Sequence, residues 1–306
     1  MPARSPAAGS LLELESLSTR DITDILKQAK ALARTPRAKL ARKLAGRRIA
    51  LLFYEASTRT RISFEYAAKN LGAVTAVMTS AGSSIEKGES LIDTGYTLEA
   101  TGAECIIMRH PNSGAAELLA KYVRVPVINA GDGMHEHPSQ GLLDAYTILE
   151  HKRSLKGLRV VIVGDIRHSR VARSNVQLLS KFGAEIVLCG PEPLLPATAT
   201  SLAKGVTIER NFDHALHGAD VVMMLRVQKE RLAGLSLDLG DYVRGYQLDG
   251  ARMAKAKKDA IFMHPGPIIR GMELTAEAAD APRSVIVEQV ANGVPIRMAL
   301  LVRAFA

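Results

Sequence analysis

Short apolar runs alternate with amphipathic segments along the whole chain. In the first half the apolar runs cover residues 48–53, 74–78, 104–108 and 125–129. In the second half they cover residues 159–163, 185–188, 220–225 and 260–263. Near-continuous apolar runs of this length are typical of strands that are buried on both faces of a parallel sheet. The pattern therefore predicts two parallel sheets, one in each half of the chain.

Helical patterns fill the gaps between these runs. Residues 60–71 carry apolar side chains at i, i+3, i+4 and i+7, and Gly72 ends the pattern. Similar patterns predict helices over residues 89–100, 113–121, 138–151, 169–182, 195–204 and 284–305. Because strands and helices alternate, we predict an α/β protein with two Rossmann-like three-layer domains and a cleft between them. The short polar segment 152–157 marks the domain boundary.

Composition narrows the class of protein. The chain has 306 residues, of which 47% are apolar and 23% charged, as in globular proteins. No run approaches the roughly 20 apolar residues that a membrane-spanning helix needs. Residues 1–10 lack the apolar core of a secretory signal, and we expect them to form a disordered tail. Cys105 and Cys189 lie in strand-like runs, which indicates buried free thiols and fits a reducing cytoplasm.

The formal net charge of +9 has two explanations. It is compatible with nucleic-acid binding, but the basic residues form no single stripe, and aromatic residues for base stacking make up only 4% of the chain. The alternative is a site for small, multiply charged anions. Motifs at the predicted strand ends, where α/β proteins bind their ligands, favour the second explanation.

A dense set of hydrogen-bond donors, Ser57-Thr58-Arg59-Thr60-Arg61, follows the first predicted strand and opens a helix. The N–H groups at a helix N-terminus bind phosphate readily, and a guanidinium adds a planar fork that suits phosphate oxygens. Helix capping by Ser57 or Thr58 would account for one hydroxyl, but not for Arg59 and Thr60 as well. The motif therefore predicts an anion site.

Two further motifs follow strands of the same half. Arg109 ends the third strand, where it either converges on the same crevice or lies on the surface. His137 and Gln140 are three residues apart, so both can face one ligand from the first turn of a helix. A metal site at His135, Glu136 and His137 is poorly supported, because these side chains diverge and no other His or Cys cluster completes the coordination. A structural role for the histidine stays open.

The second half repeats the arrangement. Residues 164–170 occupy the place of a Rossmann glycine motif, but two of its glycines are missing, which argues against a dinucleotide. Residues 226–231 follow another strand and are rich in cations, so they form either a solvated loop or a carboxylate clamp. Residues 264–267 read His-Pro-Gly-Pro, and the two prolines fix the backbone and expose its carbonyl groups.

Taken in order, these motifs resemble the catalytic chain of the aspartate transcarbamoylase family. The matching segments are residues 53–65, 108–111, 129–133, 137–140, 226–231 and 264–267. The resemblance runs from about residue 10 to the C-terminus. It implies transfer of a carbamoyl group from carbamoyl phosphate to L-aspartate, an early step of pyrimidine synthesis, without a metal or organic cofactor.

The resemblance also assigns the site residues. Catalytic roles would fall to Arg59, Thr60, Arg109 and His137. Carbamoyl phosphate would be bound by Ser57, Thr58, Arg59, Thr60, Arg109, His137, Gln140, Gly266 and Pro267. Aspartate would be bound by Lys87, Arg170, Arg226 and Gln228. Glu55 and Arg231 would take part in domain closure, and Ser83 and Lys87 would be donated to a neighbouring subunit's site.

Domain roles and partners follow from the same resemblance. Residues 1–151, completed by the C-terminal helix 284–306, would bind carbamoyl phosphate, and residues 152–283 would bind aspartate. The family implies a cytoplasmic homotrimer, alone or in a larger assembly with regulatory or dihydroorotase-like chains, and no nucleic-acid or membrane partner. Two departures stand out, namely Ile269, where a polar residue is expected, and the pair His135-Glu136.

Alternatives remain within the family. Ornithine transcarbamoylase shares the 57–61 motif, but Arg226, Lys229 and Arg231 would repel the ammonium group of its substrate. Its His-Cys-Leu-Pro motif is also replaced here by His264-Pro265-Gly266-Pro267. A non-catalytic homologue that acts as a scaffold is a second alternative, although Arg59, Arg109 and His137 are all present.

Overall fold

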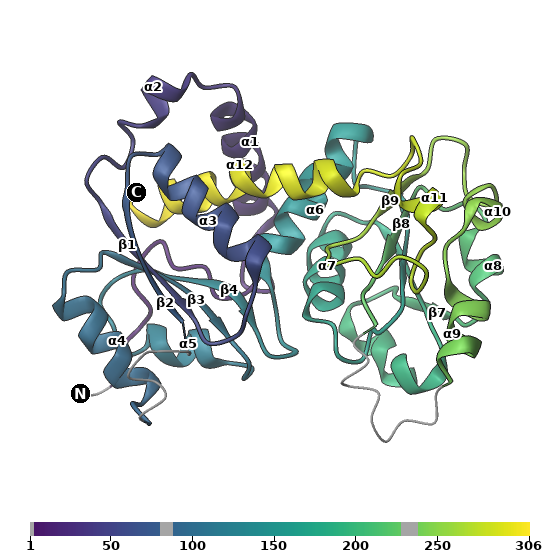
Figure 1. The fold of residues 1–306 in the computed structure, drawn as a ribbon, viewed down its shortest axis with the longest axis horizontal. Helices are drawn as coiled ribbons and strands as arrows, with labels where there is room; N and C mark the ends of the chain where they lie inside the picture. Colours follow the sequence, from purple (N-terminus) through teal and green to yellow (C-terminus); the bar gives the residue numbers. More distant parts are fainter. Residues whose placement is uncertain (1–2, 80–87, 228–237) are drawn as a thin grey trace. The chain divides into compact units, whose positions relative to one another are not determined.

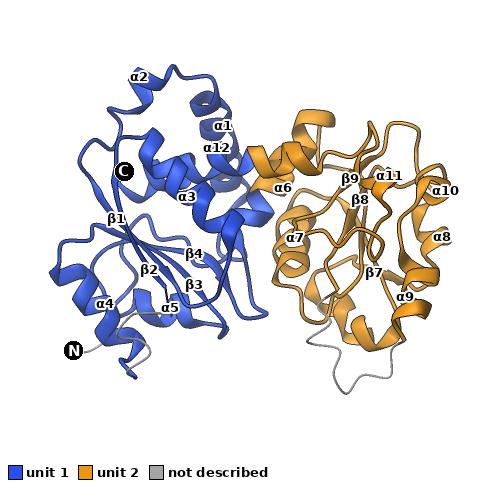
Figure 2. Ribbon diagram, viewed as in Figure 1, with its two compact units in different colours: residues 1–142, 292–306 blue, residues 143–291 orange. Residues whose placement is uncertain are grey.

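The computed structural model describes residues 3–79, 88–227 and 238–306 (Figure 1). Of the candidate site residues, Ser83, Lys87, Gln228 and Arg231 lie outside the described residues. The chain divides into two compact units, which Figure 2 colours separately. Unit 1 comprises residues 1–142 and 292–306, and unit 2 comprises residues 143–291. The functional domain boundaries at residues 151/152 and 283/284 stay a prediction.

Unit 1 is built on a parallel sheet with the strand order β2-β1-β3-β4. Its strands are β1 (Arg48–Phe53), β2 (Val74–Thr79), β3 (Cys105–His110) and β4 (Val127–Asp132). Helices α4 (Leu91–Ala100) and α5 (Ala115–Ala120) pack on one face, where Leu98 and Leu119 meet Leu52 and Ile106. Helices α1 (Thr19–Ala33), α2 (Arg37–Leu40) and α3 (Thr58–Asn70) lie on the other side (Figure 1).

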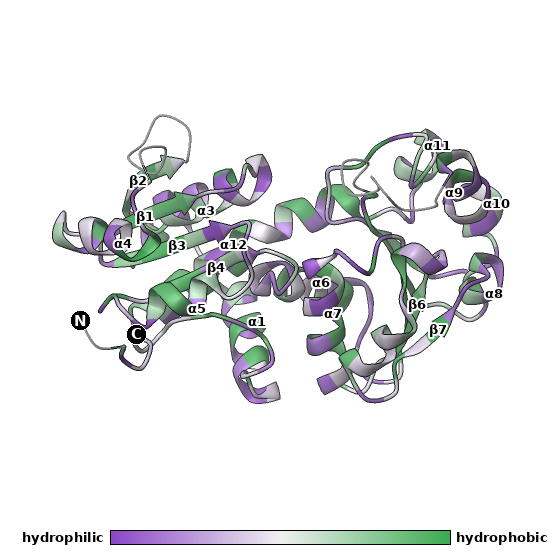
Figure 3. Cartoon of the chain, turned by 90° about the horizontal axis from the view of Figure 1, so that it is seen from below, coloured by the Kyte–Doolittle hydropathy of each residue, from purple (hydrophilic) through white to green (hydrophobic). Residues whose placement is uncertain are grey.

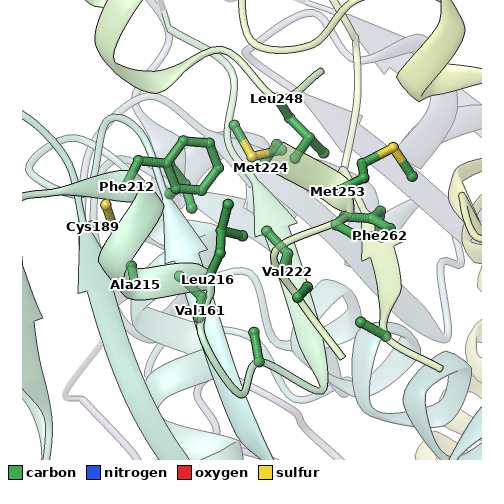
Figure 4. Packing of buried hydrophobic residues seen from close by; sticks show 14 of the residues in the cluster. Val161, Cys189, Phe212, Ala215, Leu216, Val222, Met224, Leu248, Met253 and Phe262 are labelled. Carbon is green, nitrogen blue, oxygen red and sulfur yellow. The ribbon is translucent and has the colours of Figure 1, made fainter. Parts of the chain in front are cut away.

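Unit 2 is built on a parallel sheet with the strand order β7-β6-β5-β8-β9. Its strands are β5 (Arg159–Val163), β6 (Glu185–Cys189), β7 (Thr207–Glu209), β8 (Val221–Met224) and β9 (Ile261–Met263). One face is covered by α8 (Phe212–Leu216), α10 (Gly250–Met253) and α11 (Ala276–Ala279). Figure 4 shows the resulting core, in which Phe212 and Leu216 pack beside Val222 and Met224. The two sheets confirm the predicted fold class.

Helices α6, α7, α9 and α12 remain to be placed. Helix α7 (Arg170–Lys181) lies in unit 2, and α9 (Leu239–Tyr246) follows the undescribed segment of that unit. The unit boundaries fall inside α6 (Pro138–His151) and α12 (Ile286–Ala304). The α-helix expected over residues 195–204 is a 3-10 helix over Ala197–Leu202, preceded by a 3-10 turn at Glu192–Leu194.

Burial explains why the apolar runs predicted the strands so well. All six residues of β4 are buried, and so are the last five residues of β1. The central strands appear mainly hydrophobic in Figure 3, as expected for strands covered on both faces. Strand β2 departs from this pattern and leaves Val74 and Val77 59% and 41% exposed.

The N-terminal residues from residue 3 onward are ordered, whereas the sequence predicted a disordered tail. The backbone N–H of Arg4 donates to the Lys121 carbonyl at 2.8 Å, and Leu11 is buried and pairs in parallel with Ile128 of β4. Residues 3–10 are therefore not the disordered tail that composition suggested. Cys105 and Cys189 are buried free thiols, as predicted. None of the described helices combines the length and the apolar character needed to cross a bilayer.

The strand orders fix where the motifs lie. In unit 1 the chain leaves β1 for β2 on one side and returns to β3 on the other, and such switch points are where open α/β sheets bind ligands. Phe53 and Arg109 are partners in the β1–β3 register, so the segment that follows β1 and the side chain of Arg109 lie at the same edge. In unit 2, β5 is the corresponding switch strand, between β6 and β8.

Candidate functional site

The N-terminus of α3 carries the predicted phosphate motif. Ser57 is the residue before the first turn, in an extended conformation, and its side chain makes no capping hydrogen bond. Simple capping by Ser57 therefore does not explain the motif. No acidic residue lies in the first turn, so the positive end of the helix dipole is not neutralised by its own sequence. Thr58 and Arg59 are exposed, and Ser57 is half-buried.

Thr60 links the first turn of α3 to the residue that precedes α6. Its hydroxyl oxygen is 3.4 Å from Nε2 of His137, and both residues are buried. Nδ1 of His137 lies 3.4 Å from the hydroxyl oxygen of Ser139. Gln140 is also buried, three residues further along α6. The structure therefore brings Thr60 and His137 together, as a shared ligand would require.

Arg109 is held on two sides at the end of β3. Its Nη2 donates to Oε1 of Glu55 at 2.5 Å, and its Nη1 donates to the Ala130 carbonyl at 3.3 Å. The Arg109 side chain is only 11% exposed, so the reach of its guanidinium is fixed before any ligand binds. A surface role for Arg109 is thereby ruled out. The sequence did not indicate its pairing with Glu55.

Asp132 organises the loop that leads from β4 to His137. Its carboxylate accepts hydrogen bonds from the backbone N–H of Gly114 at 2.7 Å and from the Asn129 amide at 2.8 Å, and it contacts Nδ1 of His135. Burial alone would raise the pKa of Asp132, but the hydrogen bonds from His135, Asn129 and Gly114 hold it below its ordinary value. The same contact with Asp132 raises the pKa of His135.

Gly133 and Glu136 each meet a structural requirement of the loop between β4 and His137. Gly133 adopts a φ of +47°, and a Cβ there would lie 2.5 Å from the backbone nitrogen of Ser113, so a side chain does not fit. Glu136 is buried, and its Oε2 accepts a hydrogen bond from the Leu14 N–H at 3.0 Å. The unusual pair His135-Glu136 thus supports the loop. Within residues 3–79, 88–227 and 238–306, no three His, Cys, Asp or Glu side chains are grouped to hold a metal ion.

In unit 2, the turn after β5 leads into α7 and positions Arg170 at the start of that helix. The carboxylate of Asp165 accepts the His168 N–H at 3.1 Å, and the Ser169 hydroxyl accepts the Ala172 N–H at 3.0 Å. Arg170 is the first residue of α7 and is 8% exposed. Gly164 adopts a φ of +124° where a Cβ would lie 3.1 Å from the Leu225 carbonyl, so this glycine lets the β5 and β8 ends approach.

The ends of β8 and β9 carry the other unit 2 candidates. Arg226 follows β8 and is half-buried. After β9, the His264 N–H donates to Oε1 of Gln289 at 3.0 Å, and Nδ1 of His264 accepts the Gly266 N–H at 2.8 Å. Gly266 has a φ of +70° and precedes Pro267 through a cis peptide bond. Both segments lie at the same sheet edge because β8 and β9 are neighbours.

Ile269 packs against a small apolar cluster of Leu194, Val227, Tyr242 and Met272. This contact accounts for an apolar residue at a position where we expected a polar one. Two buried side chains nearby, Glu273 and Gln289, hold the 264–270 segment but were not found from the sequence. No motif marks them, because each acts on backbone groups far from it along the chain.

Two family descriptions together match most of the chain. The first, "Aspartate/ornithine carbamoyltransferase, carbamoyl-P binding domain", matches residues 10–150, and the second, "Aspartate/ornithine carbamoyltransferase, Asp/Orn binding domain", matches residues 156–304. The chain belongs to the aspartate/ornithine carbamoyltransferase family. Among members of this family, the aspartate carbamoyltransferase catalytic subunit of Koribacter versatilis is 58% identical over 298 residues, which cover 97% of each chain.

Solved carbamoyltransferase structures share the fold. Aspartate transcarbamoylase from Trypanosoma cruzi, in complex with carbamoyl aspartate and phosphate, has a TM-score of 0.87 and 33% identity, covering 99% of this chain and 97% of that one. Ornithine carbamoyltransferase from Pyrococcus furiosus has a TM-score of 0.85 and 30% identity, covering 98% and 97%. The fold therefore identifies a carbamoyltransferase but does not by itself choose the acceptor amine.

Proposed function

We propose that this protein transfers the carbamoyl group of carbamoyl phosphate to the amine of L-aspartate, giving N-carbamoyl-L-aspartate and phosphate. The observation that carries the choice of aspartate is the 58% identity, over 97% of both chains, to an aspartate carbamoyltransferase catalytic subunit. N-carbamoyl-L-aspartate contains the carbon and nitrogen atoms from which a pyrimidine ring can be closed. We therefore assign the enzyme to pyrimidine biosynthesis.

The groups of unit 1 suit the carbamoyl phosphate half of the reaction. The N-terminus of α3, with Ser57, Thr58 and Arg59, offers N–H, hydroxyl and guanidinium donors to a phosphate. Thr60, Arg109 and His137 would donate to the carbonyl oxygen, on which negative charge grows during attack. Each such preplaced donor is typically worth about 10²–10³ in rate. Their burial and fixed partners mean that little reorganisation is needed.

The groups of unit 2 suit the amino acid half. Arg170 and Arg226 would bind the two carboxylates of aspartate, with help from Gln228 and from Lys87 of a neighbouring subunit. The carbonyl groups of Gly266 and Pro267, together with Gln140, would accept hydrogen bonds from the carbamoyl NH₂. The neutral amine of aspartate then attacks the carbonyl carbon, phosphate leaves with the electron pair of the C–O bond, and the nitrogen gives up one proton to the departing phosphate. Glu55 and Arg231 would assist domain closure.

We also propose the organisation that the family resemblance implied. Residues 1–151 with helix 284–306 would bind carbamoyl phosphate, and residues 152–283 would bind aspartate. The enzyme would work in the cytoplasm as a homotrimer, alone or with regulatory or dihydroorotase-like chains. Two buried free thiols agree with a reducing compartment.

A carbamoyl-transfer assay that offers L-aspartate and L-ornithine in parallel tests the proposed function. We expect carbamoyl phosphate to be consumed with aspartate and not with ornithine, because arginines at the acceptor site would repel the ornithine ammonium group. Native mass measurement on the same preparation reports the subunit number. Transfer to ornithine alone, or to neither amine, would refute the proposed function.

A further inference from the structure

A single buried carboxylate joins the two site segments of unit 2. Oε1 of Glu273 accepts the Val227 N–H at 3.0 Å, and Oε2 accepts the Ile269 N–H at 3.0 Å. Glu273 is 0% exposed. One bond therefore reaches the residue after Arg226, and the other reaches the second residue after Pro267.

Beyond the sheet, the two segments meet through Glu273 and through the apolar cluster in which Val227 and Ile269 pack. They leave neighbouring strands, β8 and β9, whose pairing ends at Met223 and Met263. Beyond that point the backbone of each segment is irregular, and the next residues after Val227 lie outside the described part of the chain. Two hydrogen bonds to the same carboxylate set the spacing between Val227 and Ile269 to the width of that group.

The surroundings show that this carboxylate is costly to bury. Val227 and Ile269 pack with Leu194, Tyr242 and Met272 in an apolar cluster, and burial raises the pKa of Glu273 despite its backbone hydrogen bonds and the nearby Arg226. An apolar side chain at this position would leave the Val227 and Ile269 N–H groups without this acceptor. A carboxyl group offers two oxygens, so it can accept from both segments at once.

We propose that Glu273 is a positioning residue that links the aspartate-binding segment at Arg226 to the carbamoyl-binding segment at Gly266 and Pro267. This inference rests on the proposed function, which assigns the two ligands to these segments. Glu273 touches neither ligand. It sets the distance between the groups that do, so its loss weakens both halves of the site together.

The test compares the full-length wild-type protein with Glu273→Gln, Glu273→Asp and, as a matched control, Glu277→Gln. Glutamine has nearly the same shape, but its NH₂ group opposes one of the two backbone N–H donors, so one segment loses its anchor. Aspartate keeps both oxygens but is shorter. Glu277 is exposed, four residues away. The measurements are the aspartate KM, calorimetric binding of carbamoyl phosphate, and the thermal unfolding midpoint.

We expect Glu273→Gln to raise the aspartate KM about tenfold, equivalent to about 1.4 kcal/mol, and to weaken carbamoyl phosphate binding as well. Glu273→Asp should recover part of both losses, and Glu277→Gln should match the wild type. A lower unfolding midpoint with both ligand constants unchanged would show a merely structural role and overturn the proposal. So would a change in one ligand constant alone, or a Glu273→Gln chain that does not fold.

Failure of the proposed function is distinguishable from failure of the linkage. If the wild type does not carbamoylate aspartate, calorimetric binding of N-(phosphonacetyl)-L-aspartate and carbamoyl phosphate to the same four proteins still measures the linkage. Weaker binding of both ligands to Glu273→Gln than to Glu277→Gln would then support it. If the wild type binds neither ligand, both proposals fail.

Discussion

Side chains around the first turn of α3 differ in their exposure. Arg109 has two defined acceptors and is 11% exposed, whereas Arg59 is exposed at the end of the helix. Arg109 is thus placed by the protein in advance. Arg59 is placed where it can close on a phosphate together with the N–H groups of the helix. The two arginines should therefore contribute in different ways to ligand binding and to transfer.

Arg59→Ala removes the guanidinium of the phosphate motif. We expect turnover with carbamoyl phosphate and aspartate to fall by at least about 10²-fold, because the leaving phosphate loses a charged donor. Steady-state rates measure this, with Arg42→Ala as an exposed control in the same unit. Activity close to that of the wild type would contradict the assignment of this motif to phosphate binding.

Arg226→Ala removes one proposed carboxylate ligand. We expect the aspartate KM to rise by about 10²-fold, since a charge-assisted hydrogen bond is lost, while carbamoyl phosphate binding changes little. The control is Arg244→Ala, whose side chain is 73% exposed. Equal losses for the two ligands would contradict a role at the aspartate site.

The pair of Asp132 and His135 should make stability depend on pH. Contact with Asp132 raises the pKa of His135 above its ordinary 6.5, so this contribution is complete below pH 6.5 and is lost as the pH rises through the folded value. Although burial opposes it, hydrogen bonding lowers the pKa of Asp132 below its ordinary 3.8, so this contribution is complete above pH 3.8 and is lost as the pH falls further.

His135→Gln should therefore destabilise the protein most between those two pH values. Denaturant unfolding at about pH 5.5 and about pH 9 measures the difference from the wild type at each pH. We expect a larger difference at the lower pH. A difference that is the same at both values would show that His135 carries no charge in this contact.

At the scale of elements, a buried polar network joins the parts of α6, α7 and α12 that lie in unit 2 to the end of β9. Asp144 on α6 accepts hydrogen bonds from the Asn175 amide at 2.7 Å and from the Gln289 amide at 2.6 Å. Gln289, on α12, in turn accepts the His264 N–H. Asp144 and Asn175 are 0% exposed. The start of the 264–270 segment is thus held through α12, while its end is held by Glu273.

Asp144→Ala would leave two buried amide donors without this acceptor. We expect the free energy of unfolding to fall by about 2–4 kcal/mol, because each unsatisfied buried donor costs about 1–3 kcal/mol. Urea unfolding measures it. Asp241→Ala is the control, because its carboxylate is 67% exposed and surface ion pairs contribute little. A loss no larger than that of the control would contradict the network's role.

The success of sequence reasoning also varied by element. Continuous apolar runs mark the strands, most of which are buried on both faces, so all the described strands but the short β7 were predicted. Helix α1 was missed although it has a capping box at Ser18 and Asp21 and an apolar face, so the same rules would have found it. Helices α8, α10 and α11 span four or five residues, too few to establish a period. Pro196 begins a 3-10 helix instead of the expected α-helix.

At the scale of the whole molecule, parallel pairing carries motif residues to the same edge of their sheet. Because parallel strands end at the same edge of their sheet, the sequence left proximity of Arg109 to the segment after β1 as one of two possibilities, and the β1–β3 register confirms it. The contacts that hold the site were not. Glu55 lies 54 residues from Arg109, and Glu273 lies 46 residues from Val227. No short-range pattern connects partners so far apart, since each is one of many acceptors along the chain.

Among the described residues, no strand pairs with the outer edge of β2 in unit 1, and Val74 and Val77 are exposed. Apolar edge strands favour pairing with another chain, which agrees with the proposed homotrimer.

If Lys87 acts in a neighbour's site, mixing inactive Lys87→Ala and Arg59→Ala chains should restore part of the activity, because some sites then receive intact residues from both subunits. Activity assays on mixed trimers verified by native mass measure this, and the absence of recovery would refute the shared site.

Unit 1 is assembled from both ends of the described chain, whereas unit 2 is one continuous stretch. The guanidinium of Arg303 donates to the carbonyl groups of Gly9 and Ser10 at 3.0 Å, and that of Arg297 lies 5.0 Å from the centre of the Phe64 ring. A ribosome delivers residues 292–306 only after all of unit 2 has been made. Unit 1 is therefore the first unit to enter synthesis and the last to be completed. Until residues 292–306 are made, Phe64 of α3 lacks its contact with Arg297.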